Sequence, residues 1–410
     1  MKRFTDLFEL QDADKARWLS MEGLRGIAVA LVFMVHYSSL VAPYVRGPGP
    51  DPAGEIWWLT GLHEIGNSGV DLFFVLSGFL IYKACIHKPM SVRRYAYRRV
   101  ERIYPTFLAV LAVYIALMLL APGMSKLPVA IGEKIVYVTS NVLLLPGIFD
   151  IKPIITVAWS LSYEALYYIL VPVAVVGLAM RRWSASQRIV FILGIYAVMI
   201  GLQAMDVPHK FRLSMFIGGI VLYEFAYHLR RGARPQSWGH SADLVVLAAL
   251  AAALSCFTLL GTNRWMIADT PLTALPAFYK FVILNVVFTI LVYRCLFADG
   301  LASAVFAWAP LRWLGNMSYS YYLFHSLALQ VFFGALSRLW PVPEGDPMAF
   351  LYLLPPAFAA SVALTVPLYL FIERPYSLVP GRNPRAGDGR AVLAAQGGGV
   401  ESNESRPSSP

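Results

Sequence analysis

Apolar runs of about 20 residues recur along this 410-residue chain, and they constrain its fold more than any other feature. As a helix, a run of that length crosses the hydrocarbon core of a bilayer, where a helix satisfies its own backbone hydrogen bonds. Only 14% of the residues are charged, whereas a soluble domain has about 25%. The sequence therefore predicts an all-α polytopic membrane protein with about ten transmembrane helices. The predicted spans are 24–42, 68–85, 104–121, 157–179, 188–205, 211–229, 242–260, 277–297, 315–338 and 349–372.

The distribution of positive charge predicts the orientation of these spans. Ten spans place both termini on one side of the membrane. If that side is the cytoplasm, it holds 25 of the 34 Lys and Arg residues and the other side holds 9, as the positive-inside rule requires. The net charge of +10 is then a topology signal, and we expect no nucleic acid partner. Residues 1–18 are predicted to be a cytoplasmic arm and residues 377–410 a disordered cytoplasmic tail.

One stretch between the spans is less apolar than the rest. Residues 130–149 include Glu133, Lys134, Asn141 and Pro146, so we expect an extracytoplasmic loop with a short amphipathic piece. The three cysteines are far apart and show no metal-ligand spacing. The sequence therefore predicts neither a metal site nor a disulfide framework.

The first span carries an arginine and a histidine on the same side. Arg25 and His36 are eleven residues apart, so on a helix they lie about 20° apart in azimuth and about 16 Å apart along the axis. An ionisable side chain at membrane depth is costly and usually functional. The spacing suggests a site that binds a charged group at the cytoplasmic surface and performs chemistry near His36.

Two carboxylates are predicted to lie at a similar depth to His36. Asp71 lies near the outer end of the second span, and Glu164 lies about two turns below the outer end of the fourth. A carboxylate beside an imidazole fixes its tautomer and suits it to general-base chemistry. We therefore expect His36, Asp71 and Glu164 to be catalytic. The structural alternative is a buried polar network that holds the helices together.

An arginine-rich segment follows the second span. Arg99 and Arg102 are one helical turn apart and would join Arg25 at the cytoplasmic surface. One arginine guanidinium can bind two phosphate oxygens at once. Positive-inside bias and binding of anionic lipid headgroups would also favour such a cluster. Ser77 and Gly78 interrupt an otherwise bulky span, either to give a thin ligand room or to let two helices approach closely.

Six motifs, taken in order, resemble the membrane-bound acyltransferase 3 family, the O-acetyltransferases of bacterial surface polysaccharides. They are Arg25-x10-His36, Gly69-Val-Asp-Leu-Phe-Phe-Val-Leu-Ser-Gly-Phe79, Arg99-x-x-Arg-Ile-Tyr-Pro105, Trp159-Ser-Leu-Ser-Tyr-Glu164, Ser318-Tyr-Ser-Tyr-Tyr-Leu-Phe-His325 and Glu373-Arg-Pro375. The resemblance covers residues 19–376, the predicted transmembrane domain. The sequence departs from the family pattern at none of these key positions.

The resemblance implies a function and assigns roles to the residues above. It implies that acyl-CoA, usually acetyl-CoA, is the co-substrate, with no permanently bound cofactor, and that the acceptor is a hydroxyl of a glycan or lipid-linked saccharide. Arg25, Arg99 and Arg102 would bind the CoA phosphates, and the pantetheine arm would pass Ser77 and Gly78. His36 would act as the base or as a transient acyl carrier. Further candidates for acceptor binding or support of the site are Tyr163, His325 and Glu373.

The resemblance also implies a multi-pass protein of the bacterial cytoplasmic (inner) membrane, with the lipid bilayer and glycan export or assembly proteins as partners. The sequence leaves other functions open. A proton-coupled transporter could use the same intramembrane histidine and carboxylates, and an inactive scaffold for glycan export is a third option. The acceptor could instead be a macrolide or another small-molecule hydroxyl. Acceptor choice is expected in the outer loops 43–66 and 122–156.

Overall fold

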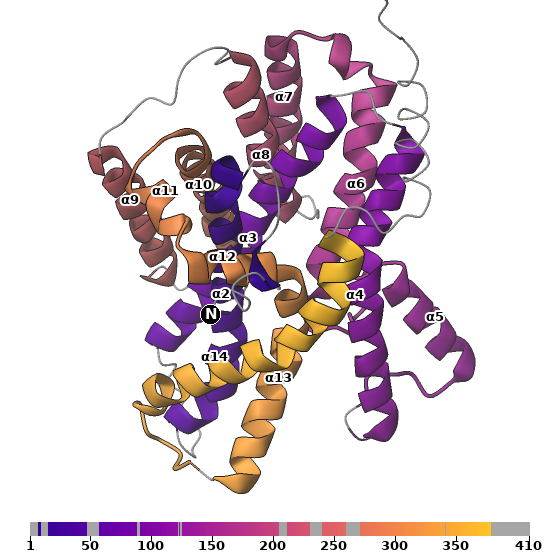
Figure 1. The fold of residues 1–410 in the computed structure, drawn as a ribbon, viewed down its shortest axis with the longest axis vertical. Coiled ribbons are helices and arrows are strands. Elements are labelled where there is room, and N and C mark those ends of the chain that lie inside the picture. Colours follow the sequence, from indigo (N-terminus) through magenta and orange to yellow (C-terminus); the bar gives the residue numbers. More distant parts are fainter. Residues whose placement is uncertain are drawn as a thin grey trace, which may run out of the picture.

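The computed structural model describes residues 7–9, 15–46, 57–87, 91–121, 123, 125–204, 211–229, 240–259, 271–340 and 342–378. Within these residues the chain is helical, and the only β-type pairing is an isolated bridge between Pro146 and Phe149. The helices form one bundle (Figure 1). The predicted all-α class is therefore confirmed. The predicted tail lies outside the described residues from position 379 onward.

Long helices make up the first half of the described chain. They are α2 (Lys15–Arg46), α3 (Trp57–Ile86), α4 (Val92–Leu120), the short α5 (Ile131–Val142), α6 (Trp159–Gly177) and α7 (Ala185–Ala204). The second half contains both short and long helices. These are α8 (Met215–Glu224), α9 (His240–Leu259), α10 (Pro271–Phe297), α11 (Leu301–Phe306), α12 (Ala309–Asn316), α13 (Ser318–Leu339) and α14 (Ala349–Leu368). A π-helical stretch extends α8 over Phe225–Leu229, and another extends α14 over Tyr369–Leu378.

Each of the ten predicted spans coincides with a helix. Six stretches of the described chain are long and apolar enough to cross a membrane: Leu19–Arg46, Trp58–Ile86, Val92–Leu120, Thr156–Gly177, Ala185–Leu202 and Ala349–Leu378. Two shorter apolar helical stretches, Ser241–Leu254 and Val282–Phe297, match the seventh and eighth predicted spans. The remaining two spans correspond to α8, which has 10 residues, and α13, which has 22 residues but carries serine, tyrosine and histidine side chains.

Glycines set the closest contacts between helices. A Cβ added to Gly69 on α3 would overlap the carbonyl oxygen of Ala28 on α2, and one added to Gly78 would overlap the carbonyl oxygen of Phe216 on α8. On the other side of α2, a Cβ on Gly315 of α12 would overlap the carbonyl oxygen of Glu22. Small residues let helix backbones touch where lipid supplies no hydrophobic drive for association. These contacts hold α2, α3, α8 and α12 in one tight group.

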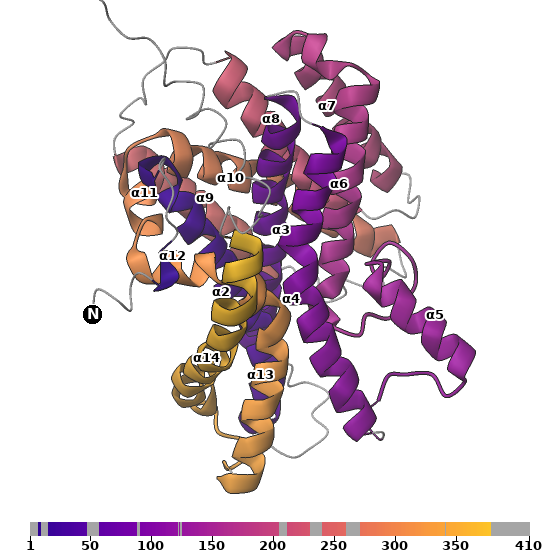
Figure 2. The ribbon, with the colours of Figure 1, turned by 45° about the vertical axis from the view of Figure 1, so that its right-hand side comes forward.

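The chain between α5 and α6 enters the molecule without forming a regular helix. Ile154, Ile155 and Val157 are almost fully buried there, and the backbone N–H of Ile154 donates to the Asn141 side chain at 2.8 Å. A single 3-10 turn, Thr156–Ala158, leads into α6. Helix α5 stands apart from the bundle on the side of α4 (Figure 2). It exposes apolar side chains such as Ile131 and Val136, as the predicted amphipathic piece requires.

Buried ion pairs join helices that are distant in sequence. Arg188 on α7 pairs with Glu224 on α8 at 2.6 Å, and Glu224 also accepts a hydrogen bond from Tyr82 on α3. Arg294 on α10 pairs with Asp243 on α9 at 2.6 Å. A charge buried away from water is tolerated where a partner is present. The pairs therefore fix which helices can be neighbours.

Part of the predicted N-terminal arm packs onto the bundle. Phe8 is buried, and its ring stacks on Tyr369 with a centroid separation of 5.8 Å. Glu9 pairs with Arg312 of α12 at 2.5 Å and accepts a hydrogen bond from the Trp313 indole at 3.1 Å. Residues 7–9 are thus tied to α12 and to the C-terminal extension of α14.

Candidate active site

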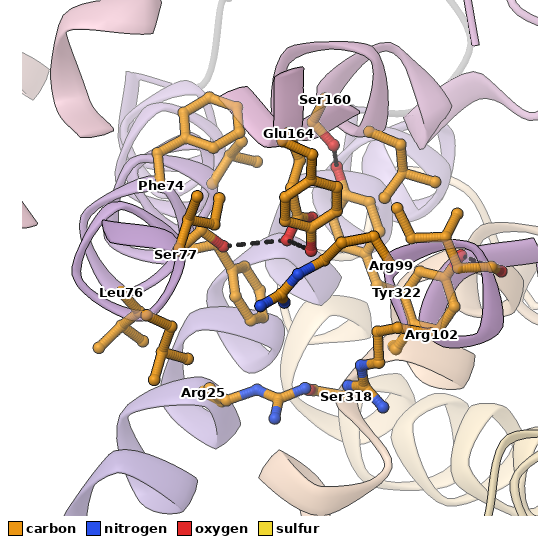
Figure 3. A pocket seen from close by; sticks show the side chains of 18 residues that line it. Arg25, Phe74, Leu76, Ser77, Arg99, Arg102, Ser160, Glu164, Ser318 and Tyr322 are labelled. Atoms are coloured by element: carbon orange, nitrogen blue, oxygen red, sulfur yellow. Dashed lines mark hydrogen bonds between the residues drawn. The ribbon is translucent and has the colours of Figure 1, made fainter. Parts of the chain in front are cut away.

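A cavity of about 180 Å³ opens between five helices and contains several of the residues that the sequence singled out. Residues of α2, α3, α4, α6 and α13 line it. Arg25, Ser77, Arg99, Arg102 and Glu164 are all among the lining residues, although they span 140 positions of the chain. Figure 3 shows the three arginines pointing into the same space from α2 and α4. The predicted convergence of the arginines is therefore present.

The three arginines differ in how they are held. Arg25 donates to the Ser318 hydroxyl at 2.9 Å, and its guanidinium has no carboxylate partner among the described residues. Arg102 pairs with Glu373 at 3.3 Å and lies 5.7 Å from the centre of the Tyr319 ring. Arg25 and Arg102 together have only one carboxylate partner among the described residues, Glu373, and both line the cavity. Such an arrangement can bind an anion with several oxygens, such as a phosphate.

Arg99 is positioned by aromatic rings. Its guanidinium carbon lies 4.9 Å from the ring centres of both Tyr95 and Tyr168. A cation over an aromatic face is stabilised by the ring quadrupole without being neutralised. The Nε of Arg99 is buried and has no hydrogen-bond partner within the described structure. An unsatisfied buried donor is costly, so this nitrogen is suited to an oxygen ligand that enters the cavity.

Glu164 is the one acidic side chain among the described residues that line the cavity. Its Oε1 accepts a hydrogen bond from the Tyr168 hydroxyl at 2.6 Å and another from the Ser77 hydroxyl at 3.2 Å. The expectation that Glu164 lies level with His36 is wrong, because Ser77 and Arg25 share its cavity. Ile154, Ile155, Val157 and Ala158 are already buried before α6 begins, so the start of α6 is not a surface position from which the depth of Glu164 can be counted.

Ser77 and Gly78 lie on different faces of α3. Ser77 lines the cavity, whereas Gly78 is packed against the backbone of Phe216 on α8. Neighbouring residues on a helix point about 100° apart, so one ligand cannot run past both. The structure therefore places Gly78 in a helix contact and not in the predicted donor path.

His36 lies outside this cavity and beside His325. The two imidazole ring centres, on α2 and α13, are 5.0 Å apart with an interplanar angle of 58°. His325 is fully buried and stacks on Tyr321 with a centroid separation of 5.5 Å. The ring of Tyr322, which lines the cavity, lies 6.3 Å from His325. Tyr322 therefore separates the arginine-lined cavity from the imidazole pair.

Asp71 is fully buried but engaged elsewhere. Both of its carboxylate oxygens accept hydrogen bonds from Arg212, each at 3.0 Å, and Arg212 also donates to the carbonyl of Asn67. Neither Asp71 nor Glu164 is hydrogen-bonded to His36 among the described contacts. The predicted carboxylate that orients His36 is thus not found in this arrangement. Arg212 was missed by the sequence analysis, although an arginine at the start of an apolar run, two residues after Lys210, was a usable signal.

Two other predicted residues, Glu373 and Tyr163, do not line the cavity. The carboxylate of Glu373 is fully buried, pairs with Arg102 and accepts two hydrogen bonds from Ser320, from its N–H at 2.9 Å and its hydroxyl at 2.7 Å. Glu373 therefore ties Arg102 to the start of α13. Tyr163 is buried against Phe74 and Trp159 and does not line the cavity.

Comparisons with known proteins give this arrangement a context. The exopolysaccharide production protein ExoZ of Rhizobium meliloti is 26% identical over 353 residues, which cover 82% of this chain and 98% of that protein. An uncharacterized protein of Haemophilus influenzae is 32% identical over 136 residues, 30% of this chain, and the match spans only about half (54%) of that relative. A protein of Komagataeibacter xylinus, provisionally named the membrane-bound transacylase BcsY, is 32% identical over 118 residues, 28% of this chain and 25% of that protein.

No solved structure matches the chain. The family model does, and it covers nearly the whole transmembrane bundle together with every motif that the sequence analysis singled out, apart from Glu373-Arg-Pro375. It is described as an acyltransferase domain, and it matches residues 18–370. The chain therefore belongs to the acyltransferase 3 family, and it is a membrane acyltransferase.

Proposed function

We propose that this chain transfers an acyl group, most simply acetyl, from acyl-CoA to a hydroxyl of an exopolysaccharide or its lipid-linked precursor. The observation that carries the proposal is the cavity in which Arg25, Arg99 and Arg102 face a single carboxylate. A CoA molecule carries several phosphate oxygens, and arginine is suited to bind them. The name of the Rhizobium meliloti relative, which refers to exopolysaccharide production, supports a glycan as the acceptor.

The proposed donor enters from the cytoplasmic side of the inner membrane, where Arg25 is predicted to lie. Its phosphates bind the three arginines, and its pantetheine arm runs beside Ser77. Tyr322 stands between this cavity and the imidazole pair, so the thioester has to pass its ring to reach His36. The Tyr322 hydroxyl is held by Ser160 at 2.7 Å and by the Val157 carbonyl at 3.1 Å.

In the proposed reaction His36 takes the proton of the acceptor hydroxyl as the oxygen attacks the thioester carbonyl. The new C–O bond forms, the C–S bond breaks, and the proton passes from His36 to the departing CoA thiolate. In the second version of the proposal, a ring nitrogen of His36 attacks the thioester carbonyl and the C–S bond breaks to release the CoA thiolate. The acceptor oxygen then attacks the acyl group, the C–N bond to His36 breaks, and the hydroxyl proton passes to the thiolate. Both versions require His36 and differ in whether an acylated protein accumulates.

The function is tested by incubating membranes that contain the protein with radiolabelled acetyl-CoA and following label into polysaccharide or lipid fractions. Wild-type protein is expected to transfer label, and a His36→Ala variant of equal abundance is not. Full transfer by His36→Ala would contradict both versions. Acylated protein trapped by rapid quenching favours the version in which His36 carries the acyl group. Label that is recovered only as free acetate argues against a glycan acceptor.

The donor site is tested separately by substitution of its arginines. Arg99→Ala is expected to raise the KM for acetyl-CoA by roughly 10- to 100-fold, since a hydrogen bond to a charged group contributes about 1.5–3 kcal/mol. Arg98→Ala is the matched control, because Arg98 is the neighbouring residue on α4, is exposed and does not line the cavity. Equal KM values for the two variants would overturn the assignment of the cavity to the donor.

A further inference from the structure

The hydrogen bonds of His325 fix which of its ring nitrogens carries a proton. Nδ1 lies 2.9 Å from the carbonyl oxygens of both Tyr321 and Tyr322, one turn earlier on α13. A carbonyl oxygen can only accept a hydrogen bond, so Nδ1 must be the donor. In a neutral imidazole the other nitrogen, Nε2, then has a free lone pair. His325 therefore presents a hydrogen-bond acceptor at a defined place.

That acceptor is buried and unsatisfied. His325 is 0% exposed, and its Nε2 has no hydrogen-bond partner in the described structure. A buried polar atom without a partner is uncommon and often marks a functional role. One face of the His325 ring is covered by Tyr321, stacked with an interplanar angle of 5°. The ring of His36 is the neighbouring imidazole, with its centre 5.0 Å away.

His36 has no carboxylate to orient it among the described contacts, because both oxygens of Asp71 bind Arg212 and Glu164 lies in the arginine-lined cavity. One turn further along α2, the Ser39 hydroxyl lies 3.4 Å from Nδ1 of His63. Among the described hydrogen bonds, Ser39 and His63 are therefore engaged with each other and not with His36.

We propose that His325 is a positioning residue for His36: Nε2 of His325 accepts a hydrogen bond from one ring N–H of His36 and thereby leaves the other nitrogen of His36 unprotonated toward the acceptor. This inference rests on the proposed function, in which His36 is the base or acyl carrier. The contact needs a rotation of the His36 ring, since no hydrogen bond links the two rings in the present arrangement. His325 thus takes the role that the sequence analysis gave to a carboxylate.

The chemical consequence concerns the proton during transfer. When His36 removes the proton from the acceptor hydroxyl, both of its nitrogens carry hydrogen, and the hydrogen bond to His325 stabilises the resulting cation. The same proton then leaves with the CoA thiolate, so His325 neither gains nor loses a proton over the cycle. An orienting partner of this kind holds a base in its productive tautomer.

Two substitutions of His325 separate this role from simple packing. His325→Asn keeps an N–H donor near the Nδ1 position for the two backbone carbonyls but removes the acceptor at Nε2. His325→Gln places an amide group near the Nε2 position, and its oxygen can accept the hydrogen bond from His36. We expect His325→Asn to lower kcat by roughly 100-fold or more, the scale of acid–base catalysis, with both KM values nearly unchanged. We expect His325→Gln to recover much of that loss.

A stability control uses a buried polar residue on α14 that contacts neither histidine and is linked to His325 only through the Tyr321 ring. Ser361 shares a hydrogen bond of 2.7 Å with the Tyr321 hydroxyl, so Ser361→Ala disturbs the α13–α14 contact without touching either histidine. It is expected to lower the unfolding temperature and to leave kcat per folded molecule at the wild-type level. If Ser361→Ala and His325→Asn lose kcat in proportion to their loss of stability, His325 is only a packing residue.

The other outcomes are equally distinct. A wild-type kcat in His325→Asn overturns the inference, and so does a raised acceptor KM at constant kcat, which would mean that Nε2 binds the acceptor and not His36. Transfer by wild-type protein together with loss of transfer in His36→Ala establishes the proposed function first. If wild-type protein itself transfers no label, the proposed function fails and not the pairing of the two histidines.

Discussion

At the scale of single residues, the charges within the bundle fall into two groups. Asp71 is matched to Arg212 by two hydrogen bonds of 3.0 Å, and Glu224 is matched to Arg188. Arg25 and Arg99, by contrast, have no carboxylate partner among the described residues, and both line the cavity. Matched charges hold the helices together, whereas the unmatched arginines are available to a ligand; Arg102 combines both, since it pairs with Glu373 and also lines the cavity. The same amino acid thus serves the fold in one place and the reaction in another.

The Asp71–Arg212 pair makes a prediction at this scale. Asp71→Asn removes the charge of the carboxylate that accepts two hydrogen bonds from the mostly buried Arg212 guanidinium, so the variant is expected to lose about 3–5 kcal/mol of stability. The measurement is thermal unfolding of the purified protein in detergent. Arg338→Gln, at the end of α13 and exposed, serves as the control and should change stability little. An Asp71→Asn protein as stable as wild type would show that the ion pair contributes nothing to the fold.

At the scale of elements, the positions of helices follow from the sequence but their depths do not. An apolar run coincides with a helix at each of the ten predicted spans, because the bilayer selects length and hydrophobicity locally. The depth of Glu164 could not be predicted, because it depends on how far residues 143–158 enter the bundle before α6 begins. Likewise, the sequence offered two interpretations of Ser77-Gly78, and the structure places Gly78 in a helix contact and Ser77 at the wall of the cavity.

The contact between α3 and α8 makes a prediction at the element scale. Gly219→Ala places a Cβ against the backbone of Val75 and Phe79, where neither helix can yield cheaply, so we expect a loss of about 1–3 kcal/mol from overpacking. Gly194→Ala on α7 is the matched control, because its Cβ would meet nothing within 4 Å. The unfolding temperatures of the two variants in the same detergent provide the comparison. Identical temperatures would mean that the helices do not touch there.

At the scale of the whole molecule, the site depends on pairings between distant parts of the chain. His36 meets His325, Arg102 meets Glu373, and Asp71 meets Arg212. Local periodicity predicts which face of one helix is polar, but it does not predict which helices pack against each other. The sequence therefore identified most of the residues of the candidate site and assigned the wrong neighbour to His36.

The predicted orientation of the molecule can be measured directly. In a background without the three native cysteines, Val129→Cys and Arg98→Cys place single thiols at exposed positions, before α5 and near the start of α4. A membrane-impermeant maleimide added to intact cells is expected to label the thiol at position 129 and not the one at position 98. After the cells are opened, both should react. The reverse pattern would place the arginine cluster on the outer side.

The irregular segment before α6 also has a mechanical consequence. One end of it is tied to α5 through Ile154 and Asn141, and the other end is tied to α13 through Val157 and Tyr322. Only three peptide units separate the two attachment points. The segment therefore links α5 directly to the Tyr322 ring that lines the cavity. A substitution that displaces α5 is thus expected to alter the position of Tyr322 as well.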